Sequence, residues 1–255
     1  MDNPSRRRFL VNAAAGGLTL ALHIPYTNNA GAEQKSSEVN AWVVVGEDDT
    51  VTIRIARSEM GQGTLTGLAQ LVAEELECDW SKVITEYPTP GQNLARQRIW
   101  GNFSTGGSRG IRESQDYVRR GGAAARLMLM TAASQAWEVP ASELTVSKGV
   151  ITHQQSGRAT TFGKVAFAAS KLPVPKDIAL KDRKDWKVIG KRLARLDTVD
   201  KVNGKQRFGV DIKLPGMLNA AIKDCPVFGG KVLSFDDGPI KERKGVRKVV
   251  TVGDS

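Results

Sequence analysis

VTIRIARSEMGQGTLTGLAQLVAEEL, residues 51–76, changes its hydrophobic periodicity partway along the stretch. Over residues 50–57 apolar side chains alternate with polar ones, which is typical of a strand with one buried face. From Leu65 to Leu76 the apolar residues recur every three or four positions, which is typical of a helix that packs one side against a core. Residues 58–63 lie between them. The stretch therefore predicts a strand, a glycine-bearing turn and a helix.

Further strands are expected on both sides of this stretch. Residues 40–45 are rich in β-forming side chains, and residues 46–49 have the composition of a turn, so that residues 40–57 predict a hairpin. Residues 82–87 predict another strand, which Pro88 ends.

A long helix is expected after a loop-like segment at residues 91–109. The helix should run from about Ile111 to Trp137 and pack closely against a neighbour at its small residues. Because glycine weakens a helix interior by roughly 1 kcal/mol relative to alanine, Gly121-Gly122 predicts a kink or a break.

The second half of the sequence predicts shorter elements and contains a basic stretch followed by recurrent glycines. A short helical turn and a strand pair are expected within residues 140–151, and a short helix at residues 164–171. The basic stretch from Lys181 to Arg195 is interpreted as an exposed linker, and glycine-punctuated strands are expected over residues 188–255. A domain boundary is expected near Asp185. From its mixture of predicted helices and strands, the sequence predicts an α+β protein.

The first 32 residues have the organisation of an export signal. Three consecutive arginines at residues 6–8 precede an uncharged apolar run, and Ala30-Gly31-Ala32 forms a cleavage-like site. The twin arginine followed by Phe-Leu resembles a twin-arginine signal peptide, whereas the alternative is an ordinary amphipathic first helix. We expect residues 1–32 to be removed and the mature protein to be periplasmic.

Composition limits the chemistry of the chain. Its two Cys and two His exclude an iron–sulfur cluster or a structural zinc site built from this chain alone, since each needs about four such ligands. Cys78 and Cys225 are either a disulfide or two thiols. The net charge of +10 suits a solvated basic face, an acidic partner subunit or a polyanion, but no basic–aromatic pattern favours nucleic acid.

Two glycine-rich turns are candidates for ligand binding. Gly61-Gln62-Gly63 precedes one predicted helix, and residues 105–109, Thr-Gly-Gly-Ser-Arg, precede the next. Glycine allows a ligand to approach the backbone closely, and a helix N-terminus offers N–H groups that suit an anion. The alternatives are a simple turn at Gln62 and ordinary Ser or Thr helix caps.

Acid–base candidates are less distinctive. Glu59 adjoins the first turn, while Glu74 and Glu75 on the following helix are expected to be solvated surface charges. His153 is expected to be exposed in a hairpin turn. No Ser–His–Asp or Cys–His arrangement stands out, so the catalytic residues are unknown and no metal ligand is assigned.

These residues together resemble the molybdenum-cofactor-binding large subunit of the xanthine dehydrogenase family. The similar branch contains isoquinoline 1-oxidoreductase β subunits and membrane-associated aldehyde dehydrogenases. The resemblance lies in Glu-Met-Gly-Gln-Gly at residues 59–63, in the turn at residues 105–109, and in residues 189–191, 196–197, 200–204, 208–211 and 214–218, which resemble the start of an α/β hammerhead domain.

The resemblance implies three parts: a signal peptide at residues 1–32, a molybdopterin-binding segment at residues 33–185 and a truncated hammerhead domain at residues 186–255. It also implies that the cofactor is contacted by Gly61, Gln62, Gly63, Gly107 and Ser108. The base glutamate of the family has no match. We therefore expect a fragment, a truncated product or one piece of a split subunit.

The implied function is oxidation of an aldehyde or an aromatic N-heterocycle with water-derived oxygen. The implied cofactor is molybdenum-molybdopterin in its cytosine dinucleotide form. The implied partners are a small subunit carrying [2Fe–2S] clusters, a cytochrome c acceptor and a small-molecule substrate, but no nucleic acid, at a periplasmic and membrane-associated location. The rival hypotheses are a non-catalytic exported remnant or partner-binding protein, and a basic module for anionic surfaces.

Overall fold

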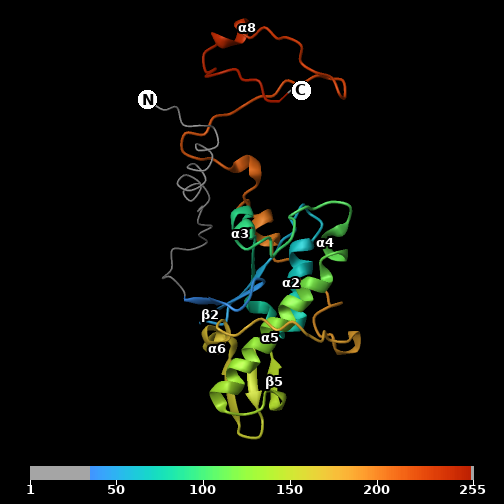
Figure 1. Ribbon diagram of the computed structural model, residues 1–255, viewed down its shortest axis with the longest axis vertical. Coiled ribbons are helices and arrows are strands. Elements are labelled where there is room, and N and C mark those ends of the chain that lie inside the picture. Colours follow the sequence, from blue (N-terminus) through green and yellow to red (C-terminus); the bar gives the residue numbers. More distant parts are fainter. Residues whose placement is uncertain (1–34, 254–255) are drawn as a thin grey trace, which may run out of the picture. The chain divides into compact units, whose positions relative to one another are not determined.

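The computed structural model describes residues 35–253, so the predicted signal peptide at residues 1–32 lies outside the described part of the chain. The chain divides into two compact units, one ending at Gln206 and the other beginning at Arg207 (Figure 1). None of the helices within residues 35–253 is long and apolar enough to cross a membrane.

A four-stranded sheet forms the centre of the first unit. Its strand order is β1 (Ser36–Glu38), β2 (Val43–Gly46), β3 (Val51–Arg54) and β4 (Val83–Glu86). The β2–β3 pair is antiparallel, which confirms the predicted hairpin, whereas β3 and β4 are parallel. A parallel pair needs a crossover connection, and α2 (Thr64–Leu76) provides it, followed by a 3₁₀ turn at Trp80–Lys82.

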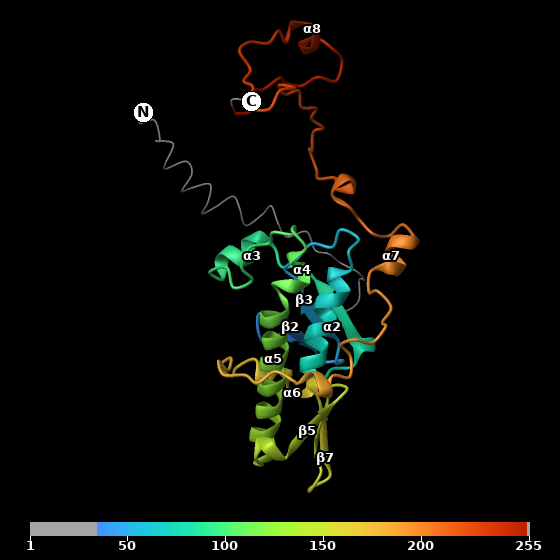
Figure 2. The ribbon, with the colours of Figure 1, turned by 90° about the vertical axis from the view of Figure 1, so that its right-hand side faces the viewer.

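Helix α2 packs against the long helix α5 (Gln115–Trp137), and Figure 2 shows the two side by side in front of the sheet. The buried face of α2 includes Leu68, Val72 and Leu76, as its periodicity predicts. These residues join β2 and β3 in one apolar core. The strand, the turn and the helix of residues 51–76 are therefore confirmed.

The break in the long helix lies elsewhere than predicted. A short helix α4 (Arg109–Arg112) ends before Ser114, and α5 then continues through Gly121 and Gly122 without interruption. Both glycines are buried, and a Cβ on Gly122 would lie 2.5 Å from the Val72 carbonyl oxygen. Close packing of α2 against these two glycines stabilises α5 and offsets the poor helix propensity of glycine. The helix is interrupted at Ser114 instead.

Replacing Gly122 by Ala should destabilise the protein by about 1–3 kcal/mol, because the methyl group would meet the α2 backbone rather than a movable side chain. Gly91→Ala is the control, since its nearest neighbour would be 3.9 Å away and alanine favours the helix. Urea denaturation of both variants is the measurement. Equal midpoints for Gly122→Ala and the wild type would contradict close packing at this position.

The segment expected to be a loop at residues 91–109 contains a helix, α3 (Pro90–Ala95). Thr89 and Gln92 form a reciprocal capping box, and Pro90 occupies the first turn. Threonine, then proline, then glutamine two residues later is a helix-start signal that can be read from sequence. The expectation was wrong because the glycine and proline content outweighed this local signal.

A second sheet has the order β5 (Leu144–Ser147), β6 (Val150–His153) and β7 (Arg158–Thr161), preceded by a 3₁₀ turn at Ala141–Glu143 and followed by α6 (Phe162–Ala169). The expected helical turn, strand pair and short helix are confirmed. His153 is not exposed in the hairpin turn. It is buried at the end of β6, where its ring nitrogens lie 2.7 Å from Ser156 Oγ and 2.9 Å from Glu143 Oε2.

Residues 181–197, here called the strap, keep most of their side chains exposed, as expected of a linker, but the backbone of the strap is hydrogen-bonded to α2. Glu74 and Glu75 are 1% and 0% exposed, so neither is a solvated surface charge. Glu74 accepts hydrogen bonds from the backbone N–H groups of Lys187, Val188 and Ile189. The strap includes a 3₁₀ turn at Arg183–Asp185, and helix α7 (Thr198–Val202) follows it.

No strand occurs within residues 188–253, so the prediction of glycine-punctuated strands there was wrong. The second unit contains a 3₁₀ turn at Gly209–Asp211 and helix α8 (Gly238–Lys241). Many of its apolar side chains, such as Phe228 and Leu233, are fully exposed. Strands are stabilised by pairing and by burial of one face, and from Arg207 to residue 253 the chain has no strand partner and buries no apolar face within the second unit.

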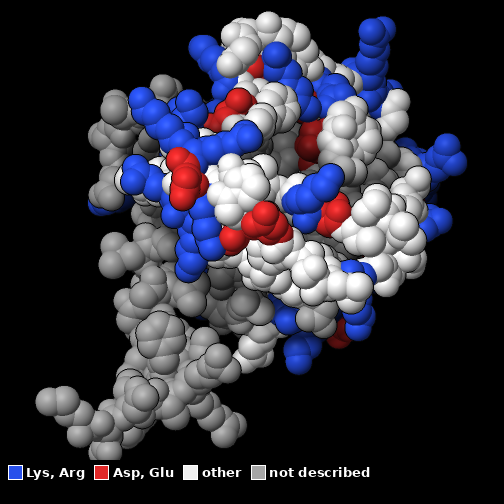
Figure 3. All heavy atoms as spheres, turned by 90° about the horizontal axis from the view of Figure 1, so that it is seen from above, with Lys and Arg blue, Asp and Glu red and all other residues white. Residues whose placement is uncertain are grey.

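Charges of both signs are mixed on the face of the molecule that Figure 3 shows. Figure 3 shows one face, seen from above, on which Lys and Arg side chains stand among acidic and uncharged residues. Cys78 and Cys225 carry free thiols. Burial raises the pKa of the Cys78 thiol to about 12, so that this group is neutral at any physiological pH.

Candidate functional site

The two glycine-bearing turns lie next to each other at the end of α2. The first turn comprises Ser58–Gly63 and the second turn Thr105–Gly110. The Ser58 N–H donates to Thr105 Oγ1 at 2.9 Å. A Cβ on Gly110 would lie 3.1 Å from the Thr64 side chain, so the second turn approaches α2 closely.

The buried side chain of Arg57 connects the segments that carry the two turns. Arg57 directly precedes the first turn and is only 8% exposed. Its Nη1 donates to the Ser104 carbonyl, beside the second turn, and its Nε donates to Ser114 Oγ at 3.1 Å. Ser114 also accepts from the Tyr117 hydroxyl at 2.6 Å. A buried guanidinium therefore connects the segment between β3 and the first turn to the segment that carries the second turn.

Glu59 fills the N-terminal end of α2. Its carboxylate accepts from the N–H groups of Gly61, Gly63 and Leu65 at 2.7, 3.0 and 3.0 Å. Burial alone would raise the pKa of Glu59, but these backbone hydrogen bonds, with Arg195 beside them, hold that pKa below its ordinary value. The N–H groups expected to receive an external anion at this helix are thus already paired with an internal one.

Other backbone donors of the turns remain available. The N–H groups of Gln62, Gly106, Gly107 and Ser108 have no acceptor within residues 35–253. The Gln62 side chain is used inside the first turn, accepting from Met60 N and donating to Ser58 O. What Gln62 offers a ligand is therefore its backbone rather than its amide.

The backbone conformation explains the residue types in both turns. Gly61, Gly63 and Gly107 have φ values of 103°, 84° and 58°, which favour glycine, and Ser108 shares this region at 55°. A Cβ on Gly61 or Gly63 would meet nothing within 4 Å, so the space over the first turn is open. The N-cap residue of α2 is Gly63, which has no side chain, and the side chain of Ser108, the N-cap residue of α4, makes no capping hydrogen bond. The alternative role of these turns as Ser or Thr helix caps is therefore excluded.

A charged cluster lies against the first turn. Arg195, from the end of the strap, contacts Glu59 and is held by Asp197, which also pairs with Lys201 at 2.5 Å. The hydrogen bond from Arg195, together with Lys201 and against the effect of burial, lowers the pKa of Asp197 to about 2. Arg57, Arg195 and Asp197 were not predicted from the sequence, because their roles depend on partners far away in the chain.

The cluster should weaken in acid. The folded pKa of Asp197, about 2, lies below its ordinary value of 3.8, so the carboxylate stabilises the fold above about pH 4 and this contribution is lost as the pH falls towards 2. The stability difference between wild type and Asp197→Asn should therefore be largest above pH 4 and shrink below it. Urea denaturation across pH 2–6 measures this, and a difference independent of pH would contradict it.

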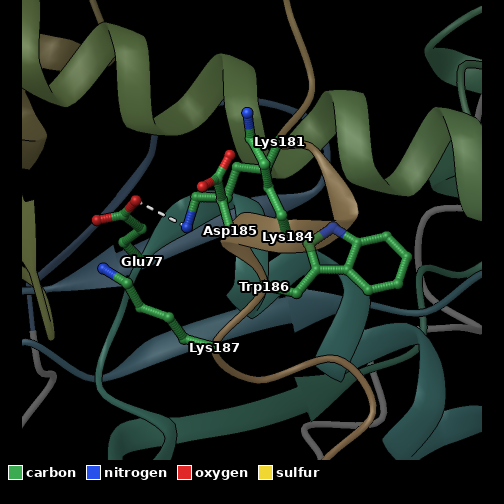
Figure 4. A pocket seen from close by; sticks show the side chains of 6 residues that line it. All are labelled: Glu77, Lys181, Lys184, Asp185, Trp186 and Lys187. Atoms are coloured by element: carbon green, nitrogen blue, oxygen red, sulfur yellow. Dashed lines mark ion pairs between the residues drawn. The ribbon is translucent and has the colours of Figure 1, made fainter.

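A shallow hollow lies away from the turns, at the other end of α2 (Figure 4). Its lining includes Glu77, Lys181 and Trp186. Lys181 Nζ pairs with Glu77 at 2.7 Å and with Glu74, so this amine holds the strap. The Trp186 Nε1 atom is buried and has no hydrogen-bond partner among the described residues. No group of His, Cys, Asp or Glu within residues 35–253 could hold a metal ion.

Comparison with known proteins gives a consistent result. The model of the molybdopterin cofactor-binding domain matches residues 10–211. The isoquinoline 1-oxidoreductase subunit beta of Brevundimonas diminuta is 32% identical over 97% of this chain and 37% of its own length. The membrane-bound aldehyde dehydrogenase [pyrroloquinoline-quinone] of Gluconacetobacter polyoxogenes is 30% identical over 98% of this chain and 33% of its own length.

The crystal structure of quinoline 2-oxidoreductase from Pseudomonas putida 86 is also similar, at 18% identity and a TM-score of 0.34 over 51% of this chain and 16% of that one. This overlap is too small to define a shared fold. The chain spans about a third of the length of the two sequence relatives. From the domain match and the identity along its length, this chain belongs to the molybdopterin cofactor-binding family of xanthine dehydrogenase-type large subunits, in the branch of isoquinoline 1-oxidoreductase β subunits and membrane-bound aldehyde dehydrogenases.

Proposed function

We propose that the two turns bind the molybdopterin cofactor in the large subunit of a molybdenum hydroxylase. The observation that carries this proposal is their adjacency: backbone N–H groups without protein acceptors occur on both turns, beside glycines with open space above them. Backbone donors of this kind suit phosphate oxygens and the polar edge of a pterin. The family match supports the same assignment.

The residues present fit such a group. Gly61 and Gly63 would allow close approach to the first turn, and Gln62 would donate its backbone N–H. Gly107 and Ser108 would donate theirs from the second turn. When bound, the cofactor supplies the molybdenum at which substrate is oxidised. Glu59 is held by three N–H groups and Arg195, so it serves the turn and is not available as a base.

The proposal also includes finer assignments, of which the relatives' names support only the substrate class and the others rest on the sequence resemblance. The substrate is an aldehyde or an aromatic N-heterocycle, as the relatives' names indicate for those proteins. The cofactor is the cytosine dinucleotide form, and electrons leave through a small [2Fe–2S] subunit to a cytochrome c acceptor. The twin arginine at the N-terminus supports export to the periplasm. We also propose that residues 186–255 are the start of an α/β hammerhead domain.

Metal and cofactor analysis of the full-length protein, purified with its co-purifying subunits, tests this function. We expect near-stoichiometric molybdenum and a pterin nucleotide. If the protein contains pyrroloquinoline quinone and no molybdenum, its cofactor is the one in the name of the aldehyde dehydrogenase relative. If it contains neither, the non-catalytic alternative is favoured. Strong binding to nucleic acid that weakens steeply with salt would favour the polyanion module.

Gly61→Val gives a test specific to the first turn. Gly157→Val is a matched control, because both glycines have positive φ and neither would place a Cβ within 4 Å of another group. Both variants should lose roughly 1–2 kcal/mol of stability from backbone strain. Only Gly61→Val should also lower the molybdenum content of the folded protein, by about tenfold or more. Equal molybdenum in the two variants would contradict cofactor binding at the first turn.

A further inference from the structure

Arg195 reaches the first turn from the strap and contacts it at two places. Its Nη1 donates to the Gly61 carbonyl at 3.0 Å, and its Nη2 donates to Glu59 Oε1 at 3.1 Å. Asp197 holds the same guanidinium through Nε and Nη2, at 3.1 and 3.0 Å. One planar cation therefore joins the backbone of the turn, the carboxylate inside it and an acidic residue of the neighbouring segment.

The contact with the Gly61 carbonyl has a consequence for Gln62. That carbonyl and the Gln62 N–H belong to one peptide plane, in which they point in opposite directions. Holding the carbonyl towards Arg195 therefore directs the Gln62 N–H away from Arg195. This N–H has no acceptor among residues 35–253. Because Gly61 has no side chain and a φ of 103°, this peptide could otherwise rotate easily.

The strap fixes the direction from which Arg195 approaches. The Leu196 N–H donates to Thr66 Oγ1 at 3.0 Å, and Gln70 Nε2 donates to the Val188 carbonyl at 2.6 Å. Glu74 binds the strap further along α2. The arginine is thus attached to the same helix whose N-terminal turn it contacts, so its guanidinium has a defined position relative to that turn.

We propose that Arg195 is a positioning residue: by holding the Gly61 carbonyl and Glu59, it orients the Gln62 backbone N–H towards an acceptor on the bound cofactor. The identity of that acceptor rests on the proposed function, whereas the effect on the turn does not. A lysine cannot replace the arginine, because four contacts with three residues require a planar group with several fixed donors, and an ammonium is a compact charge.

Amide hydrogen exchange in the full-length protein tests the effect on the turn. The variants are Arg195→Ala and Arg195→Lys, with Arg192→Ala as a control, since Arg192 is an exposed arginine of the same strap. Exchange of the Gly61, Gly63 and Leu65 N–H groups should accelerate about tenfold in both Arg195 variants and remain unchanged in the control. Unchanged exchange in Arg195→Ala, or full rescue by Arg195→Lys, would overturn the proposal.

Molybdenum content of the same preparations tests the second step. We expect a several-fold loss in both Arg195 variants at unchanged yield of folded protein. Faster exchange with full molybdenum content would show that the orientation of the turn does not matter for the cofactor, which overturns this step. Absence of molybdenum from the wild type would instead overturn the proposed function, and the exchange rates would still decide whether Arg195 holds the turn.

Discussion

Replacing Glu74 by Gln should lower the free energy of unfolding by about 3–5 kcal/mol, the usual cost of breaking a buried charge pair from one side. The Glu74 carboxylate accepts three backbone N–H groups of the strap through Oε2 and pairs with Lys181 Nζ at 3.1 Å through Oε1. A glutamine can accept through one oxygen only, and its NH₂ group would face donors. Lys181 would lose a partner in a position that is largely buried.

Urea denaturation of the full-length protein measures this effect. Glu47→Gln is the control, because Glu47 is exposed in the turn between β2 and β3 and should change stability by less than about 0.5 kcal/mol. Limited proteolysis provides a second measurement, since the backbone of the strap is held by Glu74 and would become accessible to cleavage by trypsin only on its release from α2. A Glu74→Gln variant with wild-type stability and an uncleaved strap would show that the buried carboxylate does not anchor this segment.

Replacing Arg57 by Met should have the second largest effect, on stability and on cofactor content together. The substitution keeps the apolar stem but leaves the Ser104 carbonyl without its donor, at an expected cost of about 2–3 kcal/mol. It also removes the contact that ties the first turn to the segment carrying the second. If the two turns bind one ligand jointly, the molybdenum content of the folded protein should fall about tenfold.

The matched control is Arg98→Met, since Arg98 is exposed in the segment between α3 and α4. Denaturation midpoints and molybdenum per folded polypeptide are measured for both variants. A destabilised Arg57→Met protein that still binds a full complement of molybdenum would separate the two effects. Alignment of the turns by Arg57 would then be unnecessary for cofactor binding.

Local signals carried most of the predictions that were confirmed. The β2–β3 hairpin and α2 follow from periodicity, since each buries one face of a regular element. The two turns follow from glycines whose backbone conformations other residues rarely adopt. The capping box at Thr89 was equally local and could have been found. The long helix was recognised from its length, but its interruption was placed at Gly121-Gly122, where α2 in fact packs closely.

The acidic and basic residues of the site were the least predictable. Glu74, Glu75 and His153 each lie in a sequence context typical of exposed side chains, yet all three are buried. Their partners are brought to them by tertiary contacts: the strap reaches Glu74 across more than a hundred residues of sequence. A charged side chain is stable in the protein interior only where such partners surround it, and the hydrophobic periodicity of a segment does not indicate which distant residues will do so.

The sequence by itself determined the order of strand, glycine turn and helix, because hydrophobic period and glycine conformation act within a few residues. It also determined the family, through motifs spread along the chain. Only the tertiary structure decided that the two turns meet, that Glu59 fills the end of α2, and that Arg195 reaches the first turn from the strap. These outcomes depend on which distant segments pack together, and hydrogen bonds between them form only after the core has brought their backbones into place.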